Sequence, residues 1–198
     1  MNISIPGPTG NLEGTLNYTK DRKSVFALLC HPHPMYGGSM HDTILDIVEE
    51  ATINLGINTI RFNFRGTGKS DGTHSGTEEY LDVISVARWL QDDCGAENII
   101  LIGYSFGASM AWKAEKDIAN RLATILIAPP TPLATRDRSE KDKIQIISGD
   151  LDPYCESSVL SQMEQVEVSP VSGADHFFSG EAERLQQVII ATIGKLLS

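Results

Sequence analysis

A serine flanked by glycines is the first residue whose surroundings predict chemistry. The pentapeptide Gly103-Tyr104-Ser105-Phe106-Gly107 follows the apolar run Asn98–Ile102 and precedes a segment with helical periodicity. The pattern G-x-S-x-G at a strand-to-helix junction is typical of a sharp turn that lifts the serine above a sheet. A serine hydroxyl is a poor nucleophile unless a base removes its proton, so a histidine and an acid must accompany it.

His176 and Asp152 are the predicted partners of Ser105. Where a serine occupies such a turn, the acid and then the histidine follow it along the chain. Of the five histidines, only His176 follows Ser105, and it lies in the loop before the last expected helix. Asp152 lies a few residues past an apolar run, where the acid is expected, while Asp150 is the competing acid and Asp175 receives little weight. The predicted catalytic residues are therefore Ser105, Asp152 and His176.

Two backbone N–H groups should complete the site, because the oxygen of a tetrahedral intermediate needs donors aimed at it. One is predicted to belong to Phe106, the residue after the serine, and the other to the loop after the first buried strand. Pro32 and Pro34 in that loop have no N–H. His33 and Met35 are the remaining candidates, and the family resemblance described below favours His33.

Apolar side chains adjacent in sequence to these groups are candidates to line a substrate pocket, although each could equally belong to the core. Such side chains commonly bind the apolar part of a small-molecule substrate. They are Met35, Tyr36, Phe106, Tyr154 and Phe177.

The elements that must position these residues follow from hydrophobic periodicity. One or two short strands are expected between Ile3 and Tyr18, and buried strands at Val25–Cys30, Ile57–Phe64, Asn98–Ile102, Leu122–Ile127, Lys143–Ile147 and Val166–Val168. Helices are expected at Met40–Leu55, Thr77–Leu90 with Thr77 as N-cap, Phe106–Ala119 and Glu181–Leu197. Alternating strands and helices predict an α/β fold, with a mostly parallel sheet and helices on both faces. Ligands bind such sheets beyond the carboxyl ends of the strands.

Composition limits the classes of function that the chain can serve. With 198 residues, 41% of them hydrophobic, the chain is expected to form one domain over residues 1–198. Its net charge of −10 argues against nucleic acid and anionic membrane surfaces as partners. No signal peptide or transmembrane run is evident. Three cysteines are an odd, sparse set, interpreted as structural thiols in a reducing compartment, so the cytoplasm is the expected location.

Three features of the sequence could be mistaken for functional sites of another kind. His31 and His33 alternate like metal ligands, yet no cysteine or carboxylate stands at ligand spacing, so no metal is predicted. Gly68-Lys69-Ser70 matches the end of a phosphate-binding loop, but Asn63 occupies the position where that pattern requires glycine. The acidic pair Glu49-Glu50 is interpreted as a solvated helix face.

Two longer motifs carry a resemblance to a known family. The segments His31-Pro32-His33-Pro34-Met35-Tyr36-Gly37-Gly38 and Arg65-Gly66-Thr67-Gly68-Lys69-Ser70 resemble those of α/β-hydrolases, specifically a small lidless bacterial group with an HPHPxxGG motif. That group is related to dienelactone hydrolases and short-chain esterases. Dienelactone hydrolases carry cysteine at the sharp turn, so Ser105 argues against that activity. Many relatives insert a helical lid where this chain has only Ala128–Asp142, so an open site is expected.

The resemblance implies a serine hydrolase that cleaves a carboxylic ester or thioester through an acyl-enzyme on Ser105. Amide hydrolysis is the less favoured reaction. The expected partner is a small-molecule acyl substrate of unspecified identity, and no cofactor is called for. The alternative is a non-catalytic member of the same fold that acts as a binding scaffold. The oligomeric state is left open.

Overall fold

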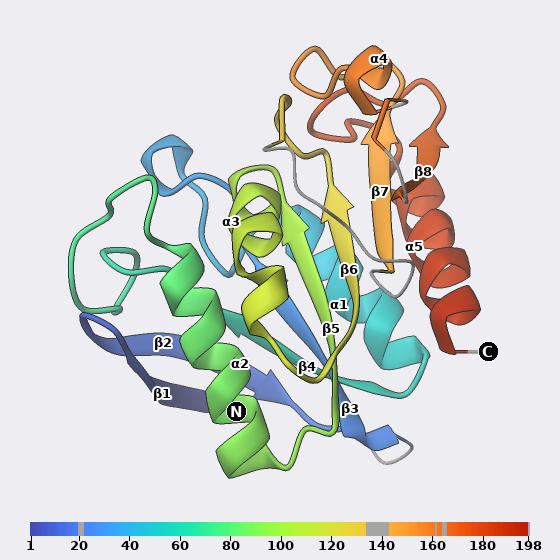
Figure 1. Ribbon diagram of the computed structural model, residues 1–198. Helices are drawn as coiled ribbons and strands as arrows, with labels where there is room; N and C mark the ends of the chain where they lie inside the picture. The colour runs from blue at the N-terminus through green and yellow to red at the C-terminus, as the bar shows by residue number, and fades with distance from the viewer. Residues whose placement is uncertain (20–21, 134–142, 161, 164–165, 198) are drawn as a thin grey trace.

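A mostly parallel sheet, as predicted, forms the centre of the protein (Figure 1). The computed structural model describes residues 1–19, 22–133, 143–160, 162–163 and 166–197. Within them the strands are β1 (Asn2–Gly7), β2 (Gly10–Asn17), β3 (Arg22–Cys30), β4 (Ile57–Phe62), β5 (Asn98–Tyr104), β6 (Arg121–Ile127), β7 (Ile144–Gly149) and β8 (Val166–Val171). These described strands form one eight-stranded sheet in the order β1-β2-β4-β3-β5-β6-β7-β8. β2 runs antiparallel to both of its neighbours, and the pairs from β4 to β8 are parallel.

Helices cover both faces of the sheet. They are α1 (Thr43–Asn54), α2 (Tyr80–Cys94), α3 (Phe106–Ala114), α4 (Ser157–Leu160) and α5 (Ala182–Leu197), with short 3₁₀ turns η1 (Pro34–Tyr36) and η2 (Glu115–Asp117). α2 and α3 pack on one face and α1 and α5 on the other (Figure 1). Successive residues of a strand point to opposite faces, and so Leu101 joins the core under α2 and α3 while Ile100 joins the core under α1 and α5.

The order of the strands fixes where a ligand can bind. From the central strand β3 the chain passes to β4 on one side, and β5 follows on the other side of β3. The carboxyl ends of β3 and β5 lie side by side, with Cys30 opposite Gly103. In open α/β sheets the crevice above such a switch point is the usual ligand site. The loops that begin at His31 and Ser105 therefore share one crevice.

The predicted start of the second helix at Thr77 is wrong. α2 begins at Tyr80, and its N-cap Glu79 makes no side-chain capping bond. The preceding residues instead form a turn in which the buried Glu79 carboxylate accepts hydrogen bonds from the N–H groups of Ser75 and Gly76. The Ser75 hydroxyl accepts hydrogen bonds from the N–H groups of Thr77 and Glu78. Hydrogen bonding by the buried Glu79 carboxylate within this turn has overridden the capping preference of Thr77.

Glu49 does not lie on a solvated face, contrary to the prediction. Its carboxylate accepts hydrogen bonds from the Asn17 side-chain amide and the Thr59 hydroxyl, at 2.9 and 2.8 Å. It also lies 2.7 Å from the Arg61 guanidinium. These contacts tie α1 to β2 and β4, and a buried charge is tolerated because its oxygens are paired in this way.

Other predicted boundaries moved by a few residues. The helix expected over Phe106–Ala119 ends as an α-helix at Ala114 and continues as the 3₁₀ turn η2. The strand expected over Ile57–Phe64 ends at Phe62. Residues 134–142 of the segment predicted to stand in place of a lid lie outside the described residues.

Candidate active site

Ser105 occupies a strained turn between β5 and α3. Its φ of 53° and ψ of −116° lie in a region that residues with a side chain rarely adopt. The glycines on either side are required by close backbone approach. A Cβ at Gly103 would lie 2.3 Å from the carbonyl oxygen of Gly107, and a Cβ at Gly107 would lie 2.2 Å from that of Cys30. The turn therefore depends on both glycines, and it projects the serine above the sheet.

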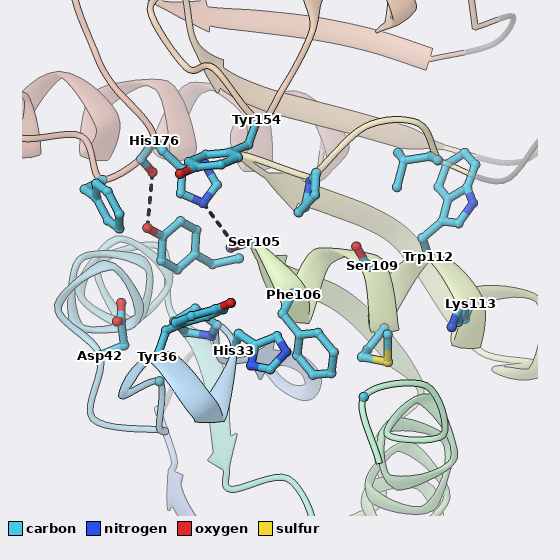
Figure 2. A pocket seen from close by; sticks show the side chains of 18 of the residues that line it. His33, Tyr36, Asp42, Ser105, Phe106, Ser109, Trp112, Lys113, Tyr154 and His176 are labelled. Carbon is cyan, nitrogen blue, oxygen red and sulfur yellow. Dashed lines mark hydrogen bonds between the residues drawn. The ribbon is translucent and has the colours of Figure 1, made fainter. Parts of the chain in front are cut away.

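The structure brings Ser105, His176 and Asp152 together from three separate loops. Ser105 Oγ lies 3.0 Å from His176 Nε2, within hydrogen-bond distance (Figure 2). His176 Nδ1 lies 2.8 Å from Asp152 Oδ2. Both partners are buried, with 6% of His176 and 7% of Asp152 exposed. This is the geometry of a nucleophile, a base and a group that orients the base.

The two other candidate acids face different groups. Asp150 accepts a hydrogen bond from the Gly173 N–H at 2.7 Å. Asp175 accepts from the N–H groups of Phe177 and Ser179, each at 3.0 Å. Each carboxylate thus fixes a turn, whereas Asp152 is the one of the three that contacts the His176 ring.

Aromatic side chains hold the His176 ring in place. The rings of Tyr154 and Phe177 meet it edge-on, with centroids 4.9 and 5.3 Å away. The buried Tyr104 hydroxyl donates to the carbonyl oxygen of His176 at 3.1 Å. The second oxygen of Asp152 accepts from the Tyr154 N–H at 2.8 Å. The ring and the carboxylate therefore have little freedom to turn away from Ser105.

The loop after β3 distinguishes the two candidate oxyanion donors. The Met35 N–H donates to His33 Nδ1 at 3.2 Å, whereas no described residue accepts from the His33 N–H. Burial lowers the pKa of His33, which favours the neutral ring that can accept this bond. The loop turns sharply at Gly38, where a Cβ would lie 2.2 Å from the Pro32 carbonyl oxygen. Phe106 begins α3, and the first N–H groups of a helix have no acceptor within it.

A cavity of about 900 Å³ opens above Ser105. Four of the five candidate pocket residues line it, namely Tyr36, Phe106, Tyr154 and Phe177. Met35 is 74% exposed and is not among the lining residues. The wall also includes residues that the sequence did not single out, among them Asp42, Ser109, Met110, Trp112, Lys113, Pro130, Pro132 and Leu133.

Comparison with known proteins places this architecture in a family. The Alpha/beta hydrolase family matches residues 28–189 of the chain. The chain belongs to the α/β hydrolase family. The α/β-hydrolase fold predicted from the sequence is thus confirmed.

Solved structures and a curated relative resemble this α/β hydrolase over nearly its whole length. A protein of Xanthomonas campestris, described as an α/β serine hydrolase without a lid, has a TM-score of 0.88 and 26% identity, over 98% of this chain and 94% of that one. An α/β serine hydrolase homologue from Coxiella burnetii has a TM-score of 0.84 and 32% identity, over 96% of each chain. An uncharacterised protein of Rickettsia prowazekii (strain Madrid E) is 27% identical over 204 residues, which cover 94% of this chain and 86% of that protein.

His31 of this α/β hydrolase uses both ring nitrogens within the protein. It is fully buried; Nδ1 lies 2.7 Å from the Pro32 carbonyl oxygen, and Nε2 accepts the Phe64 N–H at 3.1 Å. Burial lowers its pKa to about 4, so the ring is neutral at pH 7. His31 therefore ties the loop after β3 to the loop after β4. Within the described ranges, no three His, Cys, Asp or Glu side chains gather closely enough to hold a metal ion.

A lower pH should reduce the free energy of unfolding of the α/β hydrolase through protonation of His31. Its folded-state pKa of about 4 lies below the ordinary value of 6.5, so the unfolded chain binds more protons between these values. Stability therefore falls as the pH drops through this window, by about 2 kcal/mol at pH 5. Urea unfolding at pH 7 and pH 5 should show this loss in the wild type and a correspondingly smaller loss in His31→Gln. An equal loss in both proteins would contradict the assignment.

The cysteines are not placed to act as nucleophiles in this α/β hydrolase. All three are free thiols, and Cys30 and Cys155 are buried. Burial raises the pKa of both, that of Cys155 to about 12. A thiol with a raised pKa stays protonated and is unreactive at neutral pH.

Within the described part of the chain, none of the helices has the length and apolar character needed to cross a bilayer.

Proposed function

We propose that the chain is a serine hydrolase that cleaves a carboxylic ester or thioester through an acyl-enzyme on Ser105. The observation that carries this proposal is the unbroken chain of contacts from Ser105 Oγ through the His176 ring to Asp152, at 3.0 and 2.8 Å. Because these residues and His33 come from loops spread between β3 and α5, we also propose that residues 1–198 act as one domain.

Acylation uses the proton path that these distances define. His176 Nε2 takes the proton of Ser105 as Oγ attacks the carbonyl carbon of the substrate. Asp152 accepts the Nδ1–H bond and stabilises the positive charge that forms on the ring. When the tetrahedral intermediate collapses, the bond to the leaving oxygen or sulfur breaks, and that atom receives the proton from Nε2. Water then repeats the sequence on the acyl-enzyme and releases the acid.

The oxyanion that forms in each half-reaction needs donors, and we assign them to the N–H groups of Phe106 and His33. The first belongs to the initial turn of α3, whose positive dipole end favours a negative charge. The second is supported by the hydrogen bond that occupies the Met35 N–H. Donors fixed before the reaction stabilise the developing charge without reorganisation.

A fluorophosphonate probe tests the proposal against the non-catalytic alternative. We expect the protein to form one covalent adduct, located on Ser105 by peptide mass spectrometry, because a probe of this kind requires an activated serine. We also expect turnover of neutral acyl esters or thioesters of graded chain length. A folded protein that resists the probe over pH 6–9 and hydrolyses none of these substrates would be a binding scaffold.

A further inference from the structure

We infer that Lys113 selects acyl groups that end in an anion, so that the preferred substrates are half-esters or half-thioesters of dicarboxylic acids. The inference rests on the proposed function, since it concerns the substrate of the same site. It follows from the positions of the charged side chains in the cavity and from the direction in which an acyl group bound to Ser105 must extend.

Lys113 lies on the same side of α3 as the serine. Ser105, Ser109 and Lys113 are four residues apart, and residues at this spacing share one face of a helix. All three line the cavity, and Figure 2 shows Ser109 between Ser105 and Lys113. At a rise of about 1.5 Å per residue, the backbone of Lys113 lies roughly 12 Å along the axis from that of Ser105. An acyl chain of moderate length spans such a distance.

The catalytic geometry directs the acyl group along this path. The leaving atom must receive its proton from His176 Nε2, so the leaving group lies on the His176 side of the reacting carbon. The acyl group then extends away from His176, toward Ser109 and Lys113 (Figure 2). Trp112 lies on that side (Figure 2), and the cavity lining includes further apolar side chains that suit a methylene chain or a ring, namely Met110, Pro130, Pro132 and Leu133.

The charges of the cavity are separated. Among the described residues that line it, Lys113 is the one lysine or arginine, and Asp42 is the one carboxylate. Figure 2 shows them on opposite sides of Ser105. The Lys113 ammonium donates to the Thr77 carbonyl oxygen at 3.3 Å, and no carboxylate of the described ranges forms an ion pair with it. Its remaining donors are available to a ligand.

This separation orients an anionic substrate in one way. The net charge of the chain is −10, so its overall field opposes the approach of anions, whereas the Lys113 ammonium in the cavity provides a local attraction. A carboxylate near Asp42 would be repelled, whereas at Lys113 it gains a charge-assisted hydrogen bond. The acyl end, not the leaving group, is therefore the part that carries the anion.

Two matched substrates test the inference. The p-nitrophenyl half-ester of suberic acid and p-nitrophenyl octanoate share leaving group and acyl length, and they differ in whether the chain ends in a carboxylate or a methyl group. We expect Lys113→Gln to lower the ratio of their kcat/KM values, half-ester over octanoate, by about tenfold, the typical value of a hydrogen bond to a charged group. Lys113→Glu should reverse the preference. Lys116→Gln, which removes an exposed lysine just beyond α3, is the matched control and should keep the wild-type ratio.

The outcomes separate the inference from the proposed function. If both esters are hydrolysed and the ratio is the same in the wild type, Lys113→Gln and Lys113→Glu, the inference is wrong and the hydrolase proposal stands. If the wild type hydrolyses neither ester and resists the fluorophosphonate, both are wrong. If the variants fail to fold, the wild type is tested with free suberate as a competitive inhibitor of p-nitrophenyl octanoate hydrolysis. Inhibition by suberate, with no inhibition by 1-octanol at the same concentration, supports the inference. The absence of inhibition by suberate overturns it.

Discussion

Ser105→Ala is expected to lower the kcat of ester hydrolysis by about 10⁶-fold, because the variant has no atom that can form the acyl-enzyme. Alanine keeps the Cβ and hence the backbone strain at residue 105, and the His176–Asp152 contact does not involve the serine. The fold and the cavity should therefore persist. Steady-state kinetics, with the thermal unfolding midpoint as a check of folding, measure the effect.

The control for Ser105→Ala is Ser85→Ala. The Ser85 hydroxyl donates to the Leu81 carbonyl within α2, away from the cavity, so its removal should leave the rate unchanged. A folded Ser105→Ala protein that hydrolyses esters at a rate close to that of the wild type would show that the nucleophile lies elsewhere.

Asp152→Asn should reduce kcat by about 10⁴-fold, the effect known for the same change in an orienting acid. The amide can occupy the place of the carboxylate, but it favours the ring tautomer that carries the proton on Nε2. His176 could then no longer accept the proton of Ser105. Measurement of kcat at saturating ester and of kcat/KM at ester concentrations well below KM determines the loss, which should appear in both because only the transition state is affected.

Asp150→Asn is the matched control for Asp152→Asn. The two aspartates belong to one loop, but Asp150 only accepts the Gly173 N–H, and an asparagine oxygen can still accept that bond. We expect the Asp150→Asn rate to stay within a few fold of the wild type. A larger loss in Asp150→Asn than in Asp152→Asn would mean that the acid has been misassigned.

The sequence predicts the architecture well because buried parallel strands are continuous apolar runs. The runs predicted at Val25–Cys30 and Asn98–Ile102 belong to β3 and β5, the strands below the crevice, and the short G-x-S-x-G pattern marks the turn that ends β5. The sequence alone favoured Asp152 over Asp150 by position in the loop, although two residues of spacing do not determine which carboxylate faces a distant histidine. That choice depends on the path of the loop after β7.

The cavity wall was predicted only in part, for a physical reason. Tyr154 and Phe177 are near the catalytic groups in sequence, so proximity alone suggested them. Asp42 and Lys113 are brought to the cavity by the orientation of α1 and α3, which depends on packing against the sheet. The spacing of Lys113 from Ser105 is a usable signal, since positions i, i+4 and i+8 fall within one broad face of a helix. Thr77 and Glu49 were misjudged because buried carboxylates find partners that local propensity does not reveal.

The positive φ of Ser105 places the stability of the protein and its proposed activity in conflict. A non-glycine residue held at such angles costs on the order of 1–3 kcal/mol, a large part of the margin that keeps a domain folded. Glycine at this position would recover much of that energy and would end catalysis by the proposed route. A lineage that no longer needed the reaction would thus gain robustness by losing it, and a screen of random variants for heat resistance alone would enrich inactive molecules. If the proposed function is correct, we expect serine to persist at this turn only while the reaction is under selection.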